Sequence, residues 1–264
     1  MIIIKIGGGK EINLDGIIRD LSEIQDKYII VHGANALRDE LAKRLDIQKK
    51  VITSLSGYSS VFSDTEAIDL LMMVYAGLRN KRIVELCQRY GINAVGLCGI
   101  DGKIIQGRRN TGIRYYEGNK TKIAHDLSGK PSQINVHLLT ILLNNGYVPV
   151  LTVPIIDENS YAINSENDDI ITLIQKELKA ESILQLIEAP GYLRNADDSS
   201  TLIPQLTRAE LVIHEQNAQG RIKRKLHALN KLFEYGQTTV IISDGRTEHP
   251  VYNALNHPGT IIIN

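Results

Sequence analysis

Short apolar runs alternate with amphipathic stretches along the 264 residues of the chain. Short apolar runs between turn residues are typical of buried strands, and longer patterns with a 3.6-residue period are typical of helices. Strands are predicted at 2–6, 28–32, 94–97, 148–153, 182–187, 238–242 and 259–263. Helices are predicted at 15–27, 35–45, 64–90, 133–145, 168–178 and 221–235.

This alternation predicts an α/β fold in which a mostly parallel sheet lies between two layers of helices. Ligands of such sheets bind beyond the carboxyl ends of the strands, so we expect the segments 5–9, 32–35 and 187–191 on that edge. Asn35 is predicted to cap the second helix, and Ser63 or Asp64 the third. Glycines stand where helix C-termini are expected, at Gly91, Gly146 and Gly236.

The segment 101–130 interrupts the pattern and is predicted to form short polar hairpins, with turns at Asp101-Gly102 and Glu117-Gly118-Asn119. It concentrates positive charge in a chain with 30 basic and 30 acidic residues. The segment is either a solvated loop or a docking surface for an acidic partner or an anionic substrate. Its cations are Lys103, Arg108, Arg109, Arg114, Lys120, Lys122 and Lys130.

The zero net charge argues against a general nucleic-acid binder. No apolar run reaches the roughly 18–20 residues of a membrane span, and no secretory segment is seen, so a cytoplasmic protein is expected. Cys87 and Cys98 lack the spacing of a zinc or redox site.

The first predicted strand carries Lys5 and runs into Gly7, Gly8 and Gly9. A lysine in a buried strand requires a partner, since burying an unpaired charge is costly. The glycines let the backbone approach a bound group and point N–H donors at it. The combination suits a phosphate, although a lysine that reaches solvent before an ordinary turn would show the same pattern.

Three further constellations are candidates for chemistry. The turn His32-Gly33-Ala34-Asn35 begins a helix and would attract an anion, or is a plain strand-to-helix turn. Asn164 and Asp168 are four residues apart before a helix, where Asp168 either orients lysines or caps the helix. The basic run 219–226 lies at a predicted helix start, which is the unfavourable end of the helix dipole for cations. The run therefore either binds an anion or is an ordinary basic run on the surface.

Separated lysines, glycine turns and one carboxylate suggest phosphoryl transfer, which depends on positioning and charge neutralisation. The P-loop and protein-kinase motifs are absent from the sequence. The chain resembles the amino acid kinase family, and within it the N-acetylglutamate kinase branch. The resemblance spans nearly the whole chain and rests on IIIKIGGG, IIVHGAN, MVYAGLRNKRIVELCQRYGINAVGLCGIDG, LLNNGYVPVLTVP, AINSENDD and GRIKRKL in this order.

The stretch 73–102, the following GRR and the later GRIKRK are most similar to kinases that act on aminoadipate or glutamate bound to LysW, a small acidic amino-group carrier protein. The resemblance implies a three-layer αβα sandwich with about eight strands. It also implies an acyl-substrate lobe at 1–170, with the basic insertion 101–130, and an ATP lobe at 171–264. We also expect ATP as the cofactor, with Mg²⁺ carried on it and no metal-ligating residues in the chain. A homodimer formed through the region 64–90 is expected as well.

Residue roles follow from the same resemblance. Lys5 and Lys225 would stabilise the transferring phosphoryl group with help from Gly8, and Asp168 would hold both lysines. The acyl substrate would contact Gly33, Ala34, Asn35 and Asn164. The nucleotide would contact Gly7, Gly8, Glu188, Gly191 and Gly220. An acidic carrier would dock on Arg108, Arg109, Arg114, Lys120 and Lys122.

The sequence departs from the family at three places. The turn after His32 reads Gly-Ala-Asn in place of glycine-rich residues, Val61 stands where an arginine usually grips a substrate carboxylate, and Ile187-Glu188-Ala189-Pro190-Gly191 replaces a Ser-Asp turn. The expected activity is phosphorylation of the side-chain carboxylate of carrier-bound aminoadipate, glutamate or both, in lysine or arginine biosynthesis. The alternatives are a kinase for free N-acetylglutamate, a carbamate or nucleotide kinase of the same fold, and a non-catalytic amino-acid-binding module.

Overall fold

The computed structural model describes residues 1–48, 50–55, 59–195, 197–218 and 220–264. Its α-helices are α1 (Leu14–Leu21), α2 (Asn35–Arg44), α3 (Thr65–Leu71), α4 (Asn80–Arg89), α5 (Val136–Asn144), α6 (Asn167–Leu178), α7 (Arg208–Asn217), α8 (Gly220–Leu232) and α9 (Pro250–Asn256). A π-helix, η1 (Met72–Arg79), joins α3 to α4, and short 3₁₀ turns lie at η2 (Asp101–Lys103), η3 (Ser199–Thr201) and η4 (Phe233–Tyr235).

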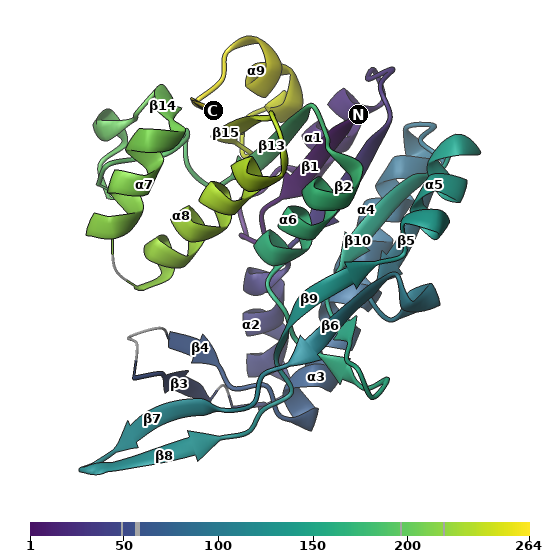
Figure 1. Cartoon of the computed structure of the whole chain (residues 1–264). Helices are drawn as coiled ribbons and strands as arrows, with labels where there is room; N and C mark the ends of the chain where they lie inside the picture. The colour runs from purple at the N-terminus through teal and green to yellow at the C-terminus, as the bar shows by residue number, and fades with distance from the viewer. Residues whose placement is uncertain (49, 56–58, 196, 219) are drawn as a thin grey trace.

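The central sheet has eight strands in the order β14-β16-β15-β13-β1-β2-β10-β5, and all neighbours are parallel except β15 and β16 (Figure 1). The expected fold, an open and mainly parallel sheet between helices, is confirmed. The strands are β14 (Gln205–Thr207), β16 (Thr260–Ile263), β15 (Thr239–Asp244), β13 (Ser182–Ile187), β1 (Ile2–Ile6), β2 (Tyr28–His32), β10 (Val148–Thr152) and β5 (Ala94–Cys98).

The two faces of β1 belong to different hydrophobic cores because successive side chains of a strand point to opposite faces. Ile2, Ile4 and Ile6 pack in the core that includes residues of α1, α4 and α9. Ile3 packs in the larger core, which includes residues of α6 and α8. Lys5 shares the face of Ile3, so its side chain lies on the side of the sheet that α6 covers.

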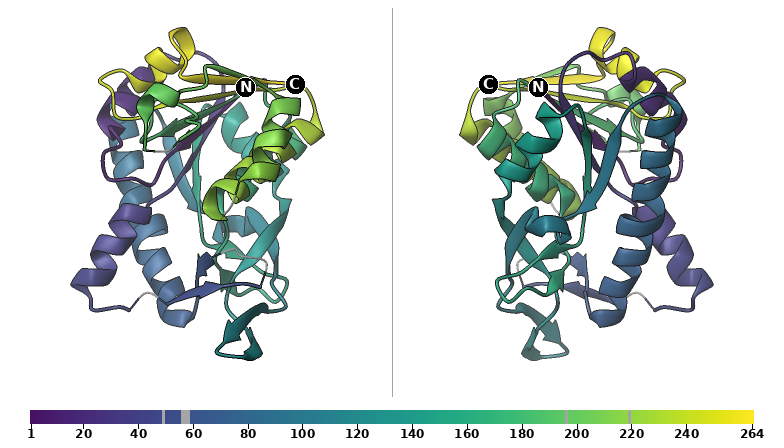
Figure 2. Two further views of the ribbon diagram at one scale, coloured as in Figure 1. Left: turned by 90° about the vertical axis from the view of Figure 1, so that its left-hand side faces the viewer. Right: turned by 90° about the vertical axis from the view of Figure 1, so that its right-hand side faces the viewer.

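The long helix predicted at 64–90 is three consecutive helical segments, and it passes from one core to the other. Val74 and Tyr75 of η1 belong to the core of α6, whereas Ile83 and Cys87 of α4 belong to the opposite core. The π-helical middle was not predicted. Its wider turn places residues four to five apart on one side, and such segments occur often at functional sites. Figure 2 shows this helix beside α2.

The segment 101–130 forms a long antiparallel ribbon. β6 (Ile105–Arg109) pairs with β9 (Gly129–Ile134), and β7 (Ile113–Glu117) pairs with β8 (Lys120–Ala124) around the predicted turn at Gly118. The β7–β8 hairpin extends away from the central sheet beside β3 (Val51–Thr53) and β4 (Ser59–Val61) (Figure 1). β6 continues the small sheet through β11 (Ile155–Ile156) and β12 (Ala162–Ile163).

Two local predictions were wrong. Asp101-Gly102 is no hairpin turn but part of η2, because the Asp101 carboxylate accepts the N–H of Cys98 at 2.7 Å and closes a tight turn after β5. Asn35 does not cap α2, since Ala34 occupies the N-cap position. Asp64 does cap α3 as predicted, accepting the N–H of Ala67 at 3.0 Å.

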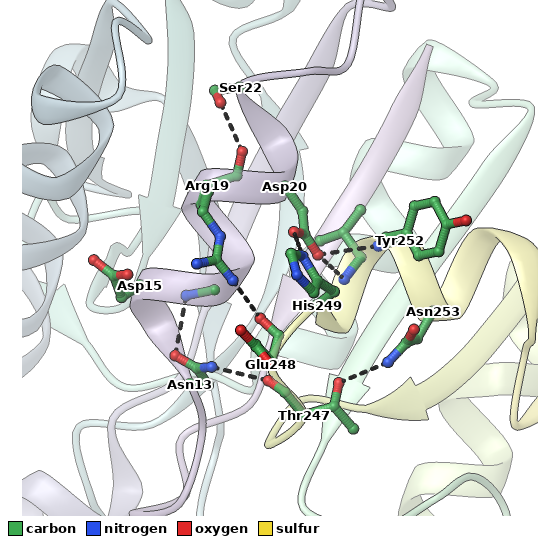
Figure 3. A network of polar contacts seen from close by, with 12 residues as sticks. Asn13, Asp15, Arg19, Asp20, Ser22, Thr247, Glu248, His249, Tyr252 and Asn253 are labelled. Carbon is green, nitrogen blue, oxygen red and sulfur yellow. Dashed lines mark hydrogen bonds and ion pairs between the residues drawn. The ribbon is translucent and has the colours of Figure 1, made fainter.

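The first and last helices are joined by a polar network centred on α1 (Figure 3). Both Val251 and Tyr252 donate their N–H groups to one oxygen of Asp20, at 3.0 and 3.1 Å. The other oxygen of Asp20 contacts Nδ1 of His249 at 2.9 Å. Asp20 therefore satisfies the first N–H groups of α9, and the carboxyl-terminal part of the chain is held against the amino-terminal helix.

Within the described residues, no helix combines the length and apolar character needed to cross a membrane.

Candidate active site

Lys5 and Asp168 form an ion pair across the carboxyl end of β1, between Nζ of Lys5 and Oδ1 of Asp168. The lysine comes from the central strand, and the aspartate comes from the first turn of α6, which lies on the same face of the sheet. The two side chains are 13% and 24% exposed, so the pair is mostly shielded but reachable from solvent. The resemblance to the family implied that Asp168 holds Lys5, and the structure places the two side chains in contact.

The glycine turn after Lys5 packs against the turn after His32 with no room for a side chain. A Cβ added to Gly8 would lie 2.7 Å from the backbone nitrogens of Ala34 and Asn35, and one added to Gly33 would lie 3.0 Å from the nitrogen of Gly8. The carbonyl of Gly8 also accepts the N–H of Ala36 at 2.9 Å, in the first turn of α2. Two of the three predicted ligand-binding turns are thus joined into one backbone surface beside Lys5.

Not every predicted N–H donor is directed to a ligand. Gly7 donates its N–H to the carbonyl of Leu186 at 2.9 Å, and Gly33 donates to Ile6 at 2.9 Å. Both bonds continue the parallel ladders of β1 into its turns, so the prediction that the Gly7 N–H meets phosphate was wrong. For the Gly8 N–H, the described residues supply no hydrogen-bond acceptor. Gly8 therefore remains the predicted phosphate donor of this turn.

The unusual Gly-Ala-Asn turn fits the backbone without strain. Ala34 has a φ of −150°, an ordinary value for a residue with a Cβ, and it lies buried at the N-cap of α2. The side chain of Asn35 accepts a hydrogen bond from the hydroxyl of Tyr75 on η1. This contact ties the start of α2 to the π-helix, and no local pattern in the sequence predicts it.

His32 is a buried structural residue rather than an acid or base. Its Nε2 lies 3.1 Å from Nδ2 of Asn80, and its carbonyl accepts hydrogen bonds from Thr152 and Asn167 at 3.0 and 2.9 Å. Burial, assisted by the positive charge of Arg79, lowers the pKa of His32 to about 3, so the ring is neutral near pH 7. The bonds fix the end of β2 against β10 and α6.

A pocket lies between α2, α3 and the segment 61–64, and it contains one of the four predicted substrate contacts. Asn164 and Val61 line it, as do Ser63 and the cations Arg38 and Lys50. Asn164 donates from Nδ2 to the hydroxyl of Ser63 at 3.0 Å. Among the described residues that line the pocket, the cations are Arg38 and Lys50, whereas Val61 stands where the family usually has an arginine. Arg38 forms an ion pair with Asp39, and Lys50 forms one with Asp64.

The predicted nucleotide residues follow β13 and begin α8. Glu188 accepts the N–H of Glu11, and its carboxylate occupies the space beside Gly9. Gly191 packs against Thr260 of β16, and α8 begins at Gly220. Lys225 is exposed on α8, which packs against α6. Its approach to the transferring group stays a prediction.

The described residues contain no group of three or more histidine, cysteine, aspartate or glutamate side chains able to hold a metal ion.

The five predicted docking cations differ in their surroundings. Arg109 forms an ion pair at 2.8 Å with the buried carboxylate of Asp157 and lies over the ring of Tyr161, so it supports the base of the ribbon rather than docking a partner. Lys122 pairs with Glu117 across the hairpin. The other three are exposed and make no ion pair with any described residue: Arg108, Arg114 and Lys120.

Four residues around the site were not anticipated from the sequence: Arg38, Tyr75, Arg79 and Asn167. Asn167 lies one residue before Asp168, within the motif AINSENDD. This neighbouring position was the one indication in the sequence that Asn167 lies near the site. Tyr75 and Arg79 lie in the stretch 73–102, in which the resemblance assigned them no role, and Arg38 stands in a helix with no local motif. Their roles depend on which helix face meets the end of β2, and that requires the tertiary structure.

Comparison with known proteins agrees with this arrangement. The family model described as "Amino acid kinase family" matches residues 1–244. A [LysW]-aminoadipate kinase of Thermus thermophilus is 35% identical over 99% of this chain and 100% of its own length. An acetylglutamate kinase of Prochlorococcus marinus is 30% identical over 94% of this chain and 79% of its own length.

Among solved structures, N-acetylglutamate synthase of Neisseria gonorrhoeae superposes with a TM-score of 0.78 at 18% identity, over 100% of this chain and 59% of that one, which supports the fold alone. The match to the family model and the full-length similarity to kinases go together with the paired Lys5 and Asp168 beside a glycine turn. The chain therefore belongs to the amino acid kinase family and is a phosphotransferase.

Proposed function

We propose that the protein transfers the γ-phosphoryl group of ATP to the side-chain carboxylate of aminoadipate, glutamate or both, held by an acidic amino-group carrier protein of the LysW type. The product would be an acyl phosphate for lysine or arginine biosynthesis. The observation that supports this most is the Lys5–Asp168 ion pair at the glycine turn, in a chain 35% identical to a [LysW]-aminoadipate kinase over its full length.

The mechanism that we propose needs no general base, because the attacking carboxylate is ionised near neutral pH. Lys5, oriented by Asp168, would neutralise charge that spreads over the phosphoryl oxygens in the transition state, and Lys225 would do so from the nucleotide side. The N–H of Gly8 would donate to the same oxygens. Mg²⁺ would arrive on the nucleotide and neutralise its phosphates, held there without a dedicated set of protein ligands.

The acyl group would lie in the pocket of Asn164 and Ser63, which is also lined by residues of α2, the helix that follows the turn of Gly33. Leu127 donates its N–H to the carbonyl of Ser63 at 2.6 Å, and Gly129 donates to Asn164 at 2.9 Å. These two bonds hold the base of the ribbon against the pocket residues Ser63 and Asn164. A carrier that presents the acyl group to this pocket would therefore come close to the ribbon.

The direct test is acyl phosphate formation. Purified protein with ATP and carrier-bound aminoadipate should give a product that hydroxylamine traps as a hydroxamate, detected by mass on the carrier. Carrier-bound glutamate and free N-acetyl-L-glutamate are the parallel substrates. A hydroxamate from free acetylglutamate alone would favour the nearest alternative function, and no hydroxamate from any of the three would contradict the proposed activity.

The exposed cations of the ribbon are proposed to attract the acidic carrier. Arg114→Glu combined with Lys120→Glu should raise KM for carrier-bound substrate about tenfold and leave kcat nearly unchanged, because complementary surface charge acts mainly on association. The rate of the variant should also depend less on salt concentration. Steady-state kinetics at several salt concentrations measure both effects.

Arg89→Glu, at the exposed end of α4 away from the ribbon, is the matched control and should leave KM unchanged. An unchanged KM and salt dependence in the double variant would contradict docking on the ribbon. We avoid Arg109 in this test, since losing its bond to buried Asp157 would disturb the fold.

The assembly and the compartment are proposals as well. A homodimer would bury the exposed Met72, Met73 and Leu78 of η1, which are 37%, 49% and 40% exposed. The proposed biosynthetic role would place the protein in the cytoplasm.

A further inference from the structure

Arg79 is a partly buried cation with unsatisfied hydrogen-bond donors. Its Nε and Nη2 atoms are shielded from solvent, and neither has a hydrogen-bond partner among the described residues. Burial lowers the pKa of Arg79, and the negative charge of Glu188 partly opposes this. A guanidinium in such a place costs stability unless its donors are satisfied, so this arginine needs an explanation beyond packing.

The position of Arg79 follows from its neighbours. It is the last residue of η1, between Tyr75, which contacts Asn35, and Asn80, which contacts His32. The positive charge of Arg79 contributes to the lowered pKa of His32 at the end of β2. The negative charge of Glu188, just after β13, acts to raise the pKa of Arg79.

Two side-chain contacts place this part of the chain at the carboxyl ends of the strands. Tyr75 bonds to Asn35, in the turn that packs against Gly8, and Asn80 contacts His32 at the end of β2. Arg79 stands between Tyr75 and Asn80, where the helix passes from one core to the other, so it lies near the joined turns of Gly8 and Gly33.

We infer that Arg79 is a further binding residue of the active site, whose free donors receive an anionic oxygen that arrives with the substrates. The oxygen belongs either to a phosphate of the nucleotide or to the carboxylate of the acyl substrate. Both are planar or tetrahedral anions that the guanidinium fork matches with paired N–H bonds. This inference rests on the proposed function, because it takes the glycine turn to be the site of phosphoryl transfer.

A structural role and a binding role for Arg79 predict opposite effects of its removal on stability. If Arg79 held the fold together, its removal would destabilise the protein. If its donors await a ligand, the unliganded protein carries an uncompensated partly buried charge, and removal of that charge should stabilise it while activity is lost. Melting temperature and activity measured on the same variant therefore separate the two roles.

The test is Arg79→Met, which keeps the length of the side chain without its charge. Without ligand, its melting temperature should rise by about 2–4 °C, and its kcat/KM should fall on the order of 10²-fold. Arg79→Lys, which keeps the charge, should recover part of the activity that Arg79→Met loses. Arg82→Met is the matched control, since Arg82 is 64% exposed and pairs with Glu85, and both measurements should stay at wild-type values.

Two binding experiments identify which ligand supplies the anionic oxygen that Arg79 binds. Calorimetry of Arg79→Met with a non-hydrolysable ATP analogue alone should show weakened binding if the oxygen is a phosphate. Calorimetry with carrier-bound aminoadipate alone should show it if the oxygen is a carboxylate. Unchanged binding in both arms, unchanged kcat/KM, or a lowered melting temperature would each overturn the inference.

Failure of the proposed function looks different. It would appear as a wild-type protein that forms no acyl phosphate, while the melting temperature and nucleotide binding of the Arg79 variants still report on this residue.

Discussion

Lys5→Ala should lower kcat on the order of 10²–10³-fold while KM for ATP and for the acyl substrate changes only a few fold. The ammonium of Lys5 compensates charge that grows on the phosphoryl oxygens in the transition state, and an interaction of that kind affects kcat far more than ground-state binding. Steady-state kinetics give both constants. Lys225→Ala should show the same division if Lys225 meets the phosphoryl group from the other side.

Lys10→Ala is the matched control for Lys5→Ala. Lys10 is a lysine of the same loop, but its side chain is exposed. Its removal leaves the ion pair between Lys5 and Asp168 intact, so turnover should remain near the wild-type rate. Near-wild-type kcat in Lys5→Ala would show that the glycine turn is not where the phosphoryl group is transferred.

Gly8→Ala should lower kcat/KM on the order of 10²-fold with a folded protein. The added Cβ would lie 2.7 Å from the backbone nitrogens of Ala34 and Asn35, closer than atoms can approach, so the two turns must separate. A displacement of about 1 Å in a site that works by positioning costs a factor of this size. Kinetics and circular dichroism on the same preparation measure activity and fold.

Gly146→Ala provides the comparison, since the added Cβ meets no atom within 4 Å there. Gly146 has a φ of 78°, so alanine is mildly strained at that position, but the strain lies at the end of α5, away from the site. The variant should lose some stability and keep its activity. Equal activity of Gly8→Ala and wild type would contradict the close contact of the two turns.

Local sequence signals were sufficient to predict a helix or strand where its whole hydrophobic pattern lies within one segment. The isoleucine-rich run of β1 and the run of β13 predict strands that the structure places at the same residues, 2–6 and 182–187. The capping box of Thr207 and Glu210 before α7 is a local signal of the same kind, although α7 was not predicted. The π-helix has no such local signal in the sequence.

The sequence by itself determined the parallel sheet and the buried lysine followed by glycines, since these follow from apolar runs and the cost of a buried charge. Its resemblance to the family implied that Asp168 holds this lysine, and the two side chains are in contact. The tertiary structure alone decided which donors remain open. Gly7 and Gly33 use their N–H groups in ladders, Arg109 is held by Asp157, and Arg79 comes from a helix whose face toward β1 depends on how the two cores are packed. The physical reason is that a donor is satisfied or open according to neighbours far away in the chain, which no local pattern encodes.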